Sequence, residues 1–181
     1  LDNPTKIPHV LCFHGVPAQG KTEFAKYLAN EVADDVTYLD ANSHMGDKHG
    51  TKHILSTIRS ASQSASLLPE GKTFKRCFII DEWHNFTNER QDSFKVTFDE
   101  LERLGCLVII CCNTDDKNTI KKVLVPAIHS RCHVIRFDIT VSQLKEVVML
   151  AKEAFPSLDL EFIKANLPDW RVLKRKMKMM T

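Results

Sequence analysis

Eight consecutive residues near the start of the chain match the pattern of a phosphate-binding loop. They are Gly15-Val16-Pro17-Ala18-Gln19-Gly20-Lys21-Thr22, and we expect all eight to contact a nucleotide. An apolar run precedes them and a helical pattern follows, which is the context in which such a loop directs backbone N–H groups at phosphate oxygens. Lys21 would contact the β- and γ-phosphates, and the Thr22 hydroxyl would hold Mg²⁺.

Two adjacent acids follow a later apolar run. Asp81 and Glu82 come directly after the segment Cys77 to Ile80, so both carboxylates are expected at the carboxyl end of a strand, beside the loop. Asp81 would bind Mg²⁺ through water, and Glu82 would act as general base for an attacking water molecule. A kinase needs no water-activating glutamate beside its magnesium aspartate, so the pair favours hydrolysis of a nucleotide.

Asn113 ends another apolar run, Leu107 to Cys112. It is expected at the same edge of the sheet as Asp81, where its amide could orient the lytic water or contact the γ-phosphate. By itself, an asparagine after a strand is an ordinary turn-forming residue. Its place in the chain order, after the loop and the acidic pair, favours the catalytic interpretation.

Five short apolar runs have the character of strands and would position these residues. Three of them are nearly continuous in apolar residues, which is typical of strands covered on both faces. Helical patterns lie between them, and this alternation predicts a three-layer α/β fold with a parallel sheet. The runs are His9–Phe13, Val36–Leu39, Cys77–Ile80, Leu107–Cys112 and Val134–Phe137.

The clearest helical patterns cover residues 21–32 and 89–104. The second has Gly105 as its expected end. The apolar face expected for the first consists of Phe24, Ala25, Leu28 and Val32.

The pattern changes after Phe137, where no further strand is predicted. A helix with an apolar face formed by Leu144, Val147, Val148 and Ala151 should begin after Ser142. A short second helix should follow at about residues 158–165, and a third at about residues 168–180. The sequence therefore predicts a nucleotide-binding core at residues 1–138 and a small helical domain at 139–181.

The order of these motifs resembles the AAA+ ATPases, and Ser130-Arg131-Cys132 looks like the Ser-Arg-Cys motif of small clamp-loader subunits. In that family the arginine is a finger that reaches into the ATP site of a neighbouring subunit, which implies a catalytic Arg131. The segment Leu167–Arg171 is similar to the family's lid motif, whose arginine touches the nucleotide in cis. The resemblance covers nearly the whole chain, and phage clamp-loader ATPases are the nearest type.

The resemblance also implies cofactors and partners. They are ATP and Mg²⁺, other AAA+ subunits in a ring-like oligomer, a sliding clamp and primer-template DNA. Lys48, Lys52 and Arg59 lie where the family's DNA-tracking helix lies, and they would contact phosphates without reading sequence. A solvated basic face is the plainer interpretation of these three residues. The alternatives are another AAA+ DNA-processing ATPase, of the helicase-loader or branch-migration type, and a subunit that binds ATP without hydrolysing it.

Composition sets outer limits on function. The net charge is +2, so bulk charge does not indicate nucleic-acid binding. There is no run of 18 apolar residues and no signal peptide, and the six cysteines form no C-x-x-C pair. We therefore expect a cytoplasmic protein, or a nuclear or host-cell one, that is neither secreted nor membrane-bound. Because the chain starts without Met and stops near the lid motif, we expect a piece of a longer protein.

Overall fold

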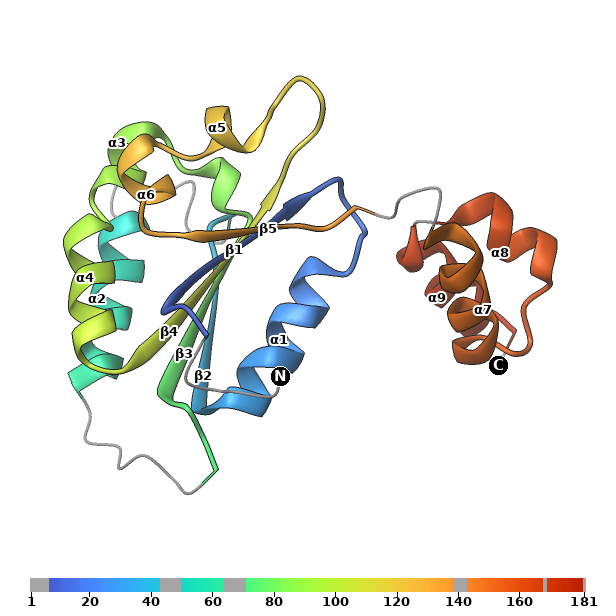
Figure 1. Cartoon of the computed structure of the whole chain (residues 1–181), viewed down its shortest axis with the longest axis horizontal. Coiled ribbons are helices and arrows are strands. Elements are labelled where there is room, and N and C mark those ends of the chain that lie inside the picture. The colour runs from blue at the N-terminus through green and yellow to red at the C-terminus, as the bar shows by residue number, and fades with distance from the viewer. Residues whose placement is uncertain (1–6, 43–49, 64–70, 139–142, 168, 181) are drawn as a thin grey trace.

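The computed structural model of the chain describes residues 7–42, 50–63, 71–138, 143–167 and 169–180. Within them, one parallel five-stranded sheet has the strand order β2-β3-β4-β1-β5, and helices cover both of its faces (Figure 1). The expected α/β fold is confirmed. The strands are β1 (Val10–Gly15), β2 (Ala33–Asp40), β3 (Phe74–Asp81), β4 (Cys106–Asn113) and β5 (His133–Arg136).

Helix α1 (Lys21–Val32) covers one face of the sheet, and α2 (Gly50–Gln63) and α4 (Lys95–Arg103) cover the other (Figure 1). Short helical segments fill the connections on the α2 side. They are a 3₁₀ turn at Trp83–Asn85, α3 (Asn88–Asp92), α5 (Ile120–Val123) and α6 (Pro126–His129).

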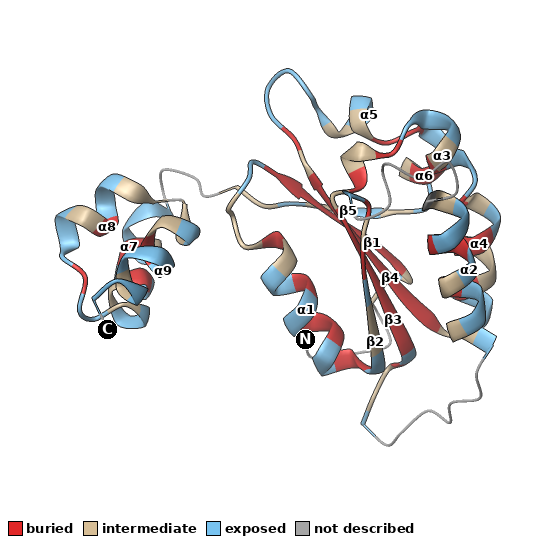
Figure 2. Cartoon of the chain, turned by 180° about the vertical axis from the view of Figure 1, so that it is seen from behind, coloured by how far each residue is buried: buried red, intermediate tan, exposed pale blue. Residues whose placement is uncertain are grey.

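The inner strands are buried on both faces, as Figure 2 shows. In β3, Phe78 and Ile80 belong to the apolar cluster under α2 and α4, while Cys77 and Ile79 belong to the cluster under α1. All four side chains have no exposed surface. Burial of each such Phe or Ile side chain stabilises the fold by about 1.5–3 kcal/mol. Because these strands are buried on both faces, their sequences are continuous apolar runs.

Three helices after the sheet form a separate group with its own small core. Ala151, Leu158, Ile163 and Leu173 are buried there. The helices are α7 (Leu144–Ala154), α8 (Leu160–Asn166) and α9 (Trp170–Lys178), and we call this group the lid. The predicted boundary between residues 138 and 139 stays a prediction, because residues 139–142, Ser142 included, lie outside the described part of the chain.

Some sequence-based details are wrong. The expected helix at 89–104 is two helices, α3 and α4, separated at Ser93, whose hydroxyl donates to the Arg90 carbonyl at 2.6 Å. Such local bonds compete with a continuous helix. Phe24 is 43% exposed and Leu144 is 40% exposed, although both were expected on buried faces. Phe24 lies in the first turn of α1, where its ring packs at a tilt against the rings of Phe13 and Phe137 and stays partly in solvent.

None of the helices in the described residues has the length and apolar character needed to cross a membrane. All six cysteines are free thiols.

Buried thiols make the free energy of unfolding depend on pH in the alkaline range. Burial raises the pKa of the Cys77 thiol, so the folded state holds its proton where the unfolded chain releases it. The stabilising contribution is complete below the unfolded pKa of about 8.5 and is lost as pH rises above it. We expect Cys77→Ala to reduce the pH slope of the unfolding free energy between pH 9 and 10 by about 1 kcal/mol per pH unit, as measured by urea unfolding with a reductant.

The matched control is Ile79→Val, which trims a neighbouring buried side chain that has no ionisable group. It should lower the unfolding free energy at every pH and leave the slope unchanged. Equal slopes for Cys77→Ala and wild type would contradict the prediction.

Candidate nucleotide-binding site

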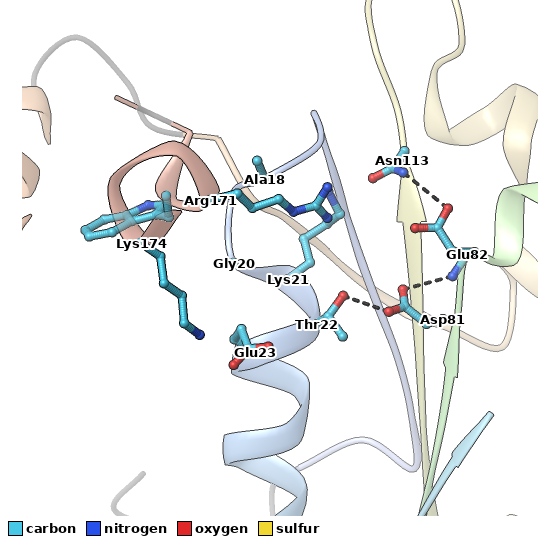
Figure 3. A pocket seen from close by; sticks show the side chains of 11 residues that line it. Ala18, Gly20, Lys21, Thr22, Glu23, Asp81, Glu82, Asn113, Arg171 and Lys174 are labelled. Atoms are coloured by element: carbon cyan, nitrogen blue, oxygen red, sulfur yellow. Dashed lines mark hydrogen bonds between the residues drawn. The ribbon is translucent and has the colours of Figure 1, made fainter. Parts of the chain in front are cut away.

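The carboxyl ends of β3 and β4 and the start of α1 surround one pocket of about 170 Å³, and helix α9 of the lid closes it from the far side (Figure 3). A pocket between a sheet edge and a helix N-terminus is a common location for anionic ligands in parallel α/β folds. The lining residues are Ala18, Gly20, Lys21, Thr22, Glu23, Asp81, Glu82, Asn113, Trp170, Arg171 and Lys174.

The loop between β1 and α1 depends on two glycines. Gly15 has φ +147°, and a Cβ there would lie 2.2 Å from the carbonyl oxygen of Phe137. Gly20 has φ +81° at the residue before α1. These conformations let the backbone curl around the position of Lys21. Of the eight predicted contact residues, Val16 and Pro17 are exposed outside the pocket, and Gln19 lines a neighbouring groove.

Lys21 is only 6% exposed, and its ammonium lies inside the loop. It donates to the carbonyls of Gly15 at 3.0 Å and Val16 at 2.7 Å. Burial lowers the pKa of this ammonium, because it removes water from the charge. An ammonium has three N–H donors, so the two bonds leave one for an anionic ligand.

The loop also holds an acceptor without a partner. The Gln19 side-chain oxygen is buried and receives no hydrogen bond from the described residues. Leaving a buried polar atom unpaired costs about 1–3 kcal/mol. The Lys21 ammonium, with one N–H donor left over, is therefore the group of the loop that fits the phosphates of a nucleotide.

Asp81 is held at the pocket by three donors. The hydroxyls of Thr22 and Tyr38 each donate to Oδ2 at 2.8 Å, and the backbone N–H of Glu82 donates to Oδ1 at 2.9 Å. Carboxylate and hydroxyl oxygens in contact are the kind of ligands that Mg²⁺ takes, so Thr22 and Asp81 fit the ion. Sequence reasoning missed Tyr38, whose only signal is its position on the strand that pairs with β3.

Glu82 adopts an unusual backbone conformation at the end of β3. Its φ of +55° lies in the left-handed region, which costs a non-glycine residue about 1–2 kcal/mol. The turn brings its carboxylate oxygen Oε2 within 3.5 Å of the Asn113 amide nitrogen (Figure 3). Asp81, Glu82 and Asn113 therefore meet at one pocket, as expected from their positions after strands. Their catalytic roles remain predictions.

The same carboxylate oxygen of Glu82 lies 3.2 Å from Nε2 of His84. On the other side of the ring, Nδ1 of His84 accepts a hydrogen bond from the backbone N–H of Asn113 at 3.2 Å. The sequence reasoning missed His84, although its position two residues after Glu82 was a signal.

The two predicted functional arginines lie in different places. Arg171 extends from α9 into the pocket, and Lys174 lines the pocket one turn further along α9. Arg131 does not line the pocket. Its guanidinium forms two hydrogen bonds with Asp99 of α4, at 2.7 and 2.9 Å, and a third with the carbonyl of Ala127 at 2.8 Å. The bonds from Arg131 hold the pKa of the Asp99 carboxyl below its ordinary value.

The residues predicted to contact DNA are described only in part. Lys52 and Arg59 are exposed on α2, two turns apart. Lys48 lies outside the described residues. A shallow hollow beside Arg59 also includes Arg103 of α4.

Comparisons with known proteins agree with the loop and the fold. A family model described as "ATPase family associated with various cellular activities (AAA)" matches residues 11–138. Replication factor C subunit 4 of Encephalitozoon cuniculi is 31% identical over 147 residues, which cover 78% of this chain and 43% of that protein. The sliding-clamp-loader large subunit of Escherichia phage RB69 is 24% identical over 92% of this chain and 52% of its own length. The chain thus spans about half the length of these relatives.

Solved structures share the architecture. Replication initiator DnaA, bound to AMPPCP and single-stranded DNA, superposes on 99% of this chain and 57% of its own chain with a TM-score of 0.66. The sequence identity is 15%, so the similarity concerns the fold alone.

Removing the loop's buried cation should abolish nucleotide binding. We expect Lys21→Ala to weaken ATP binding at least about 100-fold, because charge-assisted hydrogen bonds to phosphate are lost. Calorimetric titration measures this affinity, and circular dichroism checks that the variant is folded. Lys26→Ala, on the exposed side of the same helix, should bind within about twofold of wild type. Equal ATP affinity in Lys21→Ala and wild type would exclude this loop as the site.

Proposed function

The chain belongs to the AAA family of ATPases, and from that membership we propose that it binds ATP with Mg²⁺ and hydrolyses it as a motor subunit of a sliding-clamp loader. The observation that best supports hydrolysis is the placement of Lys21, Asp81 and Glu82 around one pocket. The clamp-loader role is supported by the names of the relatives, a replication factor C subunit and phage clamp-loader subunits.

The pocket suggests how ATP would lie. Lys21 would hold the β- and γ-phosphates, with the γ-phosphate toward Glu82 and Asn113 at the ends of β3 and β4. The nucleoside would then extend the opposite way, over a shallow groove between the loop and the end of β5. That groove is partly aromatic and would suit a stacked base. Its lining residues are Gln19, Phe24, Ile135, Arg136, Phe137 and Asp138.

Mg²⁺, held by Thr22 and Asp81, would supply positive charge that offsets the charge of the phosphates. Glu82 would accept a proton from a water molecule as the water oxygen attacks the γ-phosphorus. The bond between that phosphorus and the bridging oxygen breaks, and ADP leaves with the electron pair. The amide of Asn113, beside the same carboxylate, would orient the water. This arrangement disfavours a subunit that binds ATP without hydrolysing it.

The lid would contact the nucleotide in cis. Arg171 and Lys174 line the pocket from α9, and the Arg171 side chain points toward Lys21 (Figure 3), so Arg171 would approach the phosphates of a bound nucleotide. Because the lid is a separate group of helices, this contact depends on where the lid sits and would respond to the nucleotide.

Arg131 would act in trans, on the ATP site of a neighbouring subunit. Its ion pair with Asp99 places it on the α4 and α6 side of the core, apart from the residues that line its own pocket. A finger arginine stabilises charge on the transferring phosphoryl group and is worth several orders of magnitude in rate. A ring of AAA+ subunits would bring it to the next site.

DNA and the clamp would bind the assembled ring. Lys52 and Arg59, exposed on α2, would contact the phosphates of primer-template DNA, and Lys48 precedes them in the sequence. Contacts of this kind position a duplex without reading its bases.

Replacing the proposed general base should stop turnover and spare binding. We expect Glu82→Gln to lower kcat at least about 100-fold, because the amide cannot accept the proton, with ATP affinity nearly unchanged. The control is Glu23→Gln, which lines the same pocket but has a side chain that is 74% exposed. It should keep kcat within about twofold. Phosphate release measures kcat, and a fall of less than about tenfold in Glu82→Gln would exclude the general-base role.

The trans role of Arg131 can be tested by mixing subunits. Arg131→Ala should lower the ATPase activity of assembled rings at least about 100-fold, and Lys21→Ala should do the same by preventing ATP binding. Combining the two should restore part of the activity, since intact fingers then meet intact loops. Arg103→Ala, an exposed arginine of α4, is the control and should leave activity unchanged. Full turnover by a monomer, independent of concentration and of Arg131, would defeat the proposal.

A further inference from the structure

His84 lies between two residues of the proposed catalytic machinery and contacts both. Nε2 of its ring is 3.2 Å from Oε2 of Glu82, and Nδ1 is 3.2 Å from the backbone nitrogen of Asn113. We propose that His84 is a positioning residue that holds the Glu82 carboxylate in the orientation it needs as a general base. The proposal rests on the ATPase function proposed above and adds a residue to that site.

The contacts of the ring define its tautomer. A backbone N–H can only donate, so Nδ1 of His84 must be the unprotonated acceptor in its bond with Asn113. The proton of the neutral ring is therefore on Nε2, where it points at the carboxylate of Glu82. The end of β4 thus selects the form of the ring that donates to the proposed base.

The two donors to Glu82 converge on one oxygen. His84 Nε2 and Asn113 Nδ2 both lie near Oε2, at 3.2 and 3.5 Å. Oε1 receives no hydrogen bond from the residues that the structure describes. Fixing Oε2 leaves Oε1 as the oxygen available to accept a proton from water, so the pair of donors orients the carboxylate as well as holding it.

The ring itself is held by the fold. Trp83, the preceding residue, is fully buried and packs against Phe86, Phe94 and Phe98. The 3₁₀ turn that contains His84 is closed by a backbone bond from Asn85 to the Glu82 carbonyl at 2.9 Å. The buried indole therefore fixes the turn, and the turn sets the position from which His84 reaches Glu82.

Two amide substitutions separate the contacts of the ring. In His84→Asn, the side-chain oxygen lies near the former position of Nδ1 and can still accept from Asn113, but the shorter side chain places no N–H near Glu82. In His84→Gln, the longer amide can place an N–H near the former position of Nε2 and donate to Glu82. If His84 only anchors the end of β4, His84→Asn should keep more ATPase activity than His84→Gln. If His84 positions the base, His84→Gln should keep more.

The experiment measures kcat and ATP affinity for both variants in the full-length protein, under the conditions that give the highest wild-type turnover. We expect His84→Asn to lower kcat about tenfold with ATP affinity within about twofold, and His84→Gln to keep at least half of the wild-type kcat. In a Glu82→Gln background, His84→Asn should have no further effect, because the group that it positions is already gone. Thermal unfolding of both variants monitors folding.

Wild-type kcat in His84→Asn, or equal losses in both variants, would overturn the proposal, and so would a further loss in the Glu82→Gln background. Glu82→Gln by itself separates a failure of the proposed ATPase mechanism from a failure of the role of His84. If it retains turnover, the proposed ATPase mechanism fails. If it loses turnover while His84→Asn does not, only the role of His84 fails.

Discussion

Two-sided burial of the inner strands is the constraint on which the site depends. Strands β1, β3 and β4 are covered by apolar layers on both faces, so a charged side chain within them would be buried without water. Polar groups are tolerated near the ends of the strands, or where they are paired, as Arg76 near the start of β3 is with Asp35 at 2.7 Å. Because parallel strands all end at the same edge, the polar residues after β3 and β4 and the loop after β1 meet there. The chemistry is concentrated at this edge because the rest of the sheet cannot hold it.

This constraint also explains how much the sequence could predict. Asp81, Glu82 and Asn113 were predictable because a polar residue after an apolar strand marks the edge. Tyr38 was not, since its contact with Asp81 depends on the pairing of β2 with β3. The position of His84 close to Glu82 in the sequence was a signal, but its contact with Glu82 depends on the left-handed conformation at Glu82, which no local sequence pattern indicates. Contacts fixed by register or by a single backbone angle are the ones that sequence reasoning misses.

The helices also combine features that the sequence predicted with features that only the structure shows. The extent of α1 was predicted correctly, but the exposure of Phe24 was not. Phe24 lies at the border between the buried and the exposed face of the helix, and the apolar spacing does not define that border. The break between α3 and α4 falls at Ser93, whose hydroxyl donates to the Arg90 carbonyl, and the continuous apolar spacing of this segment gave no sign of it. Arg131 and Arg171 were identified by family resemblance, and only the fold shows that they differ in location. Arg171 lines the pocket, whereas Arg131 is bound to Asp99.

The two loop glycines differ in which residues could replace them. At Gly15 the obstacle is space, since an added methyl group would overlap the Phe137 carbonyl, and every other amino acid carries that carbon. At Gly20 no atom lies within 4 Å of an added Cβ, and only the backbone angle is unfavourable. Asparagine and aspartate adopt that angle more readily than other residues. A saturation library of this loop, selected for folding rather than for nucleotide binding, would therefore show an invariant position 15 and a position 20 that admits a few small polar variants.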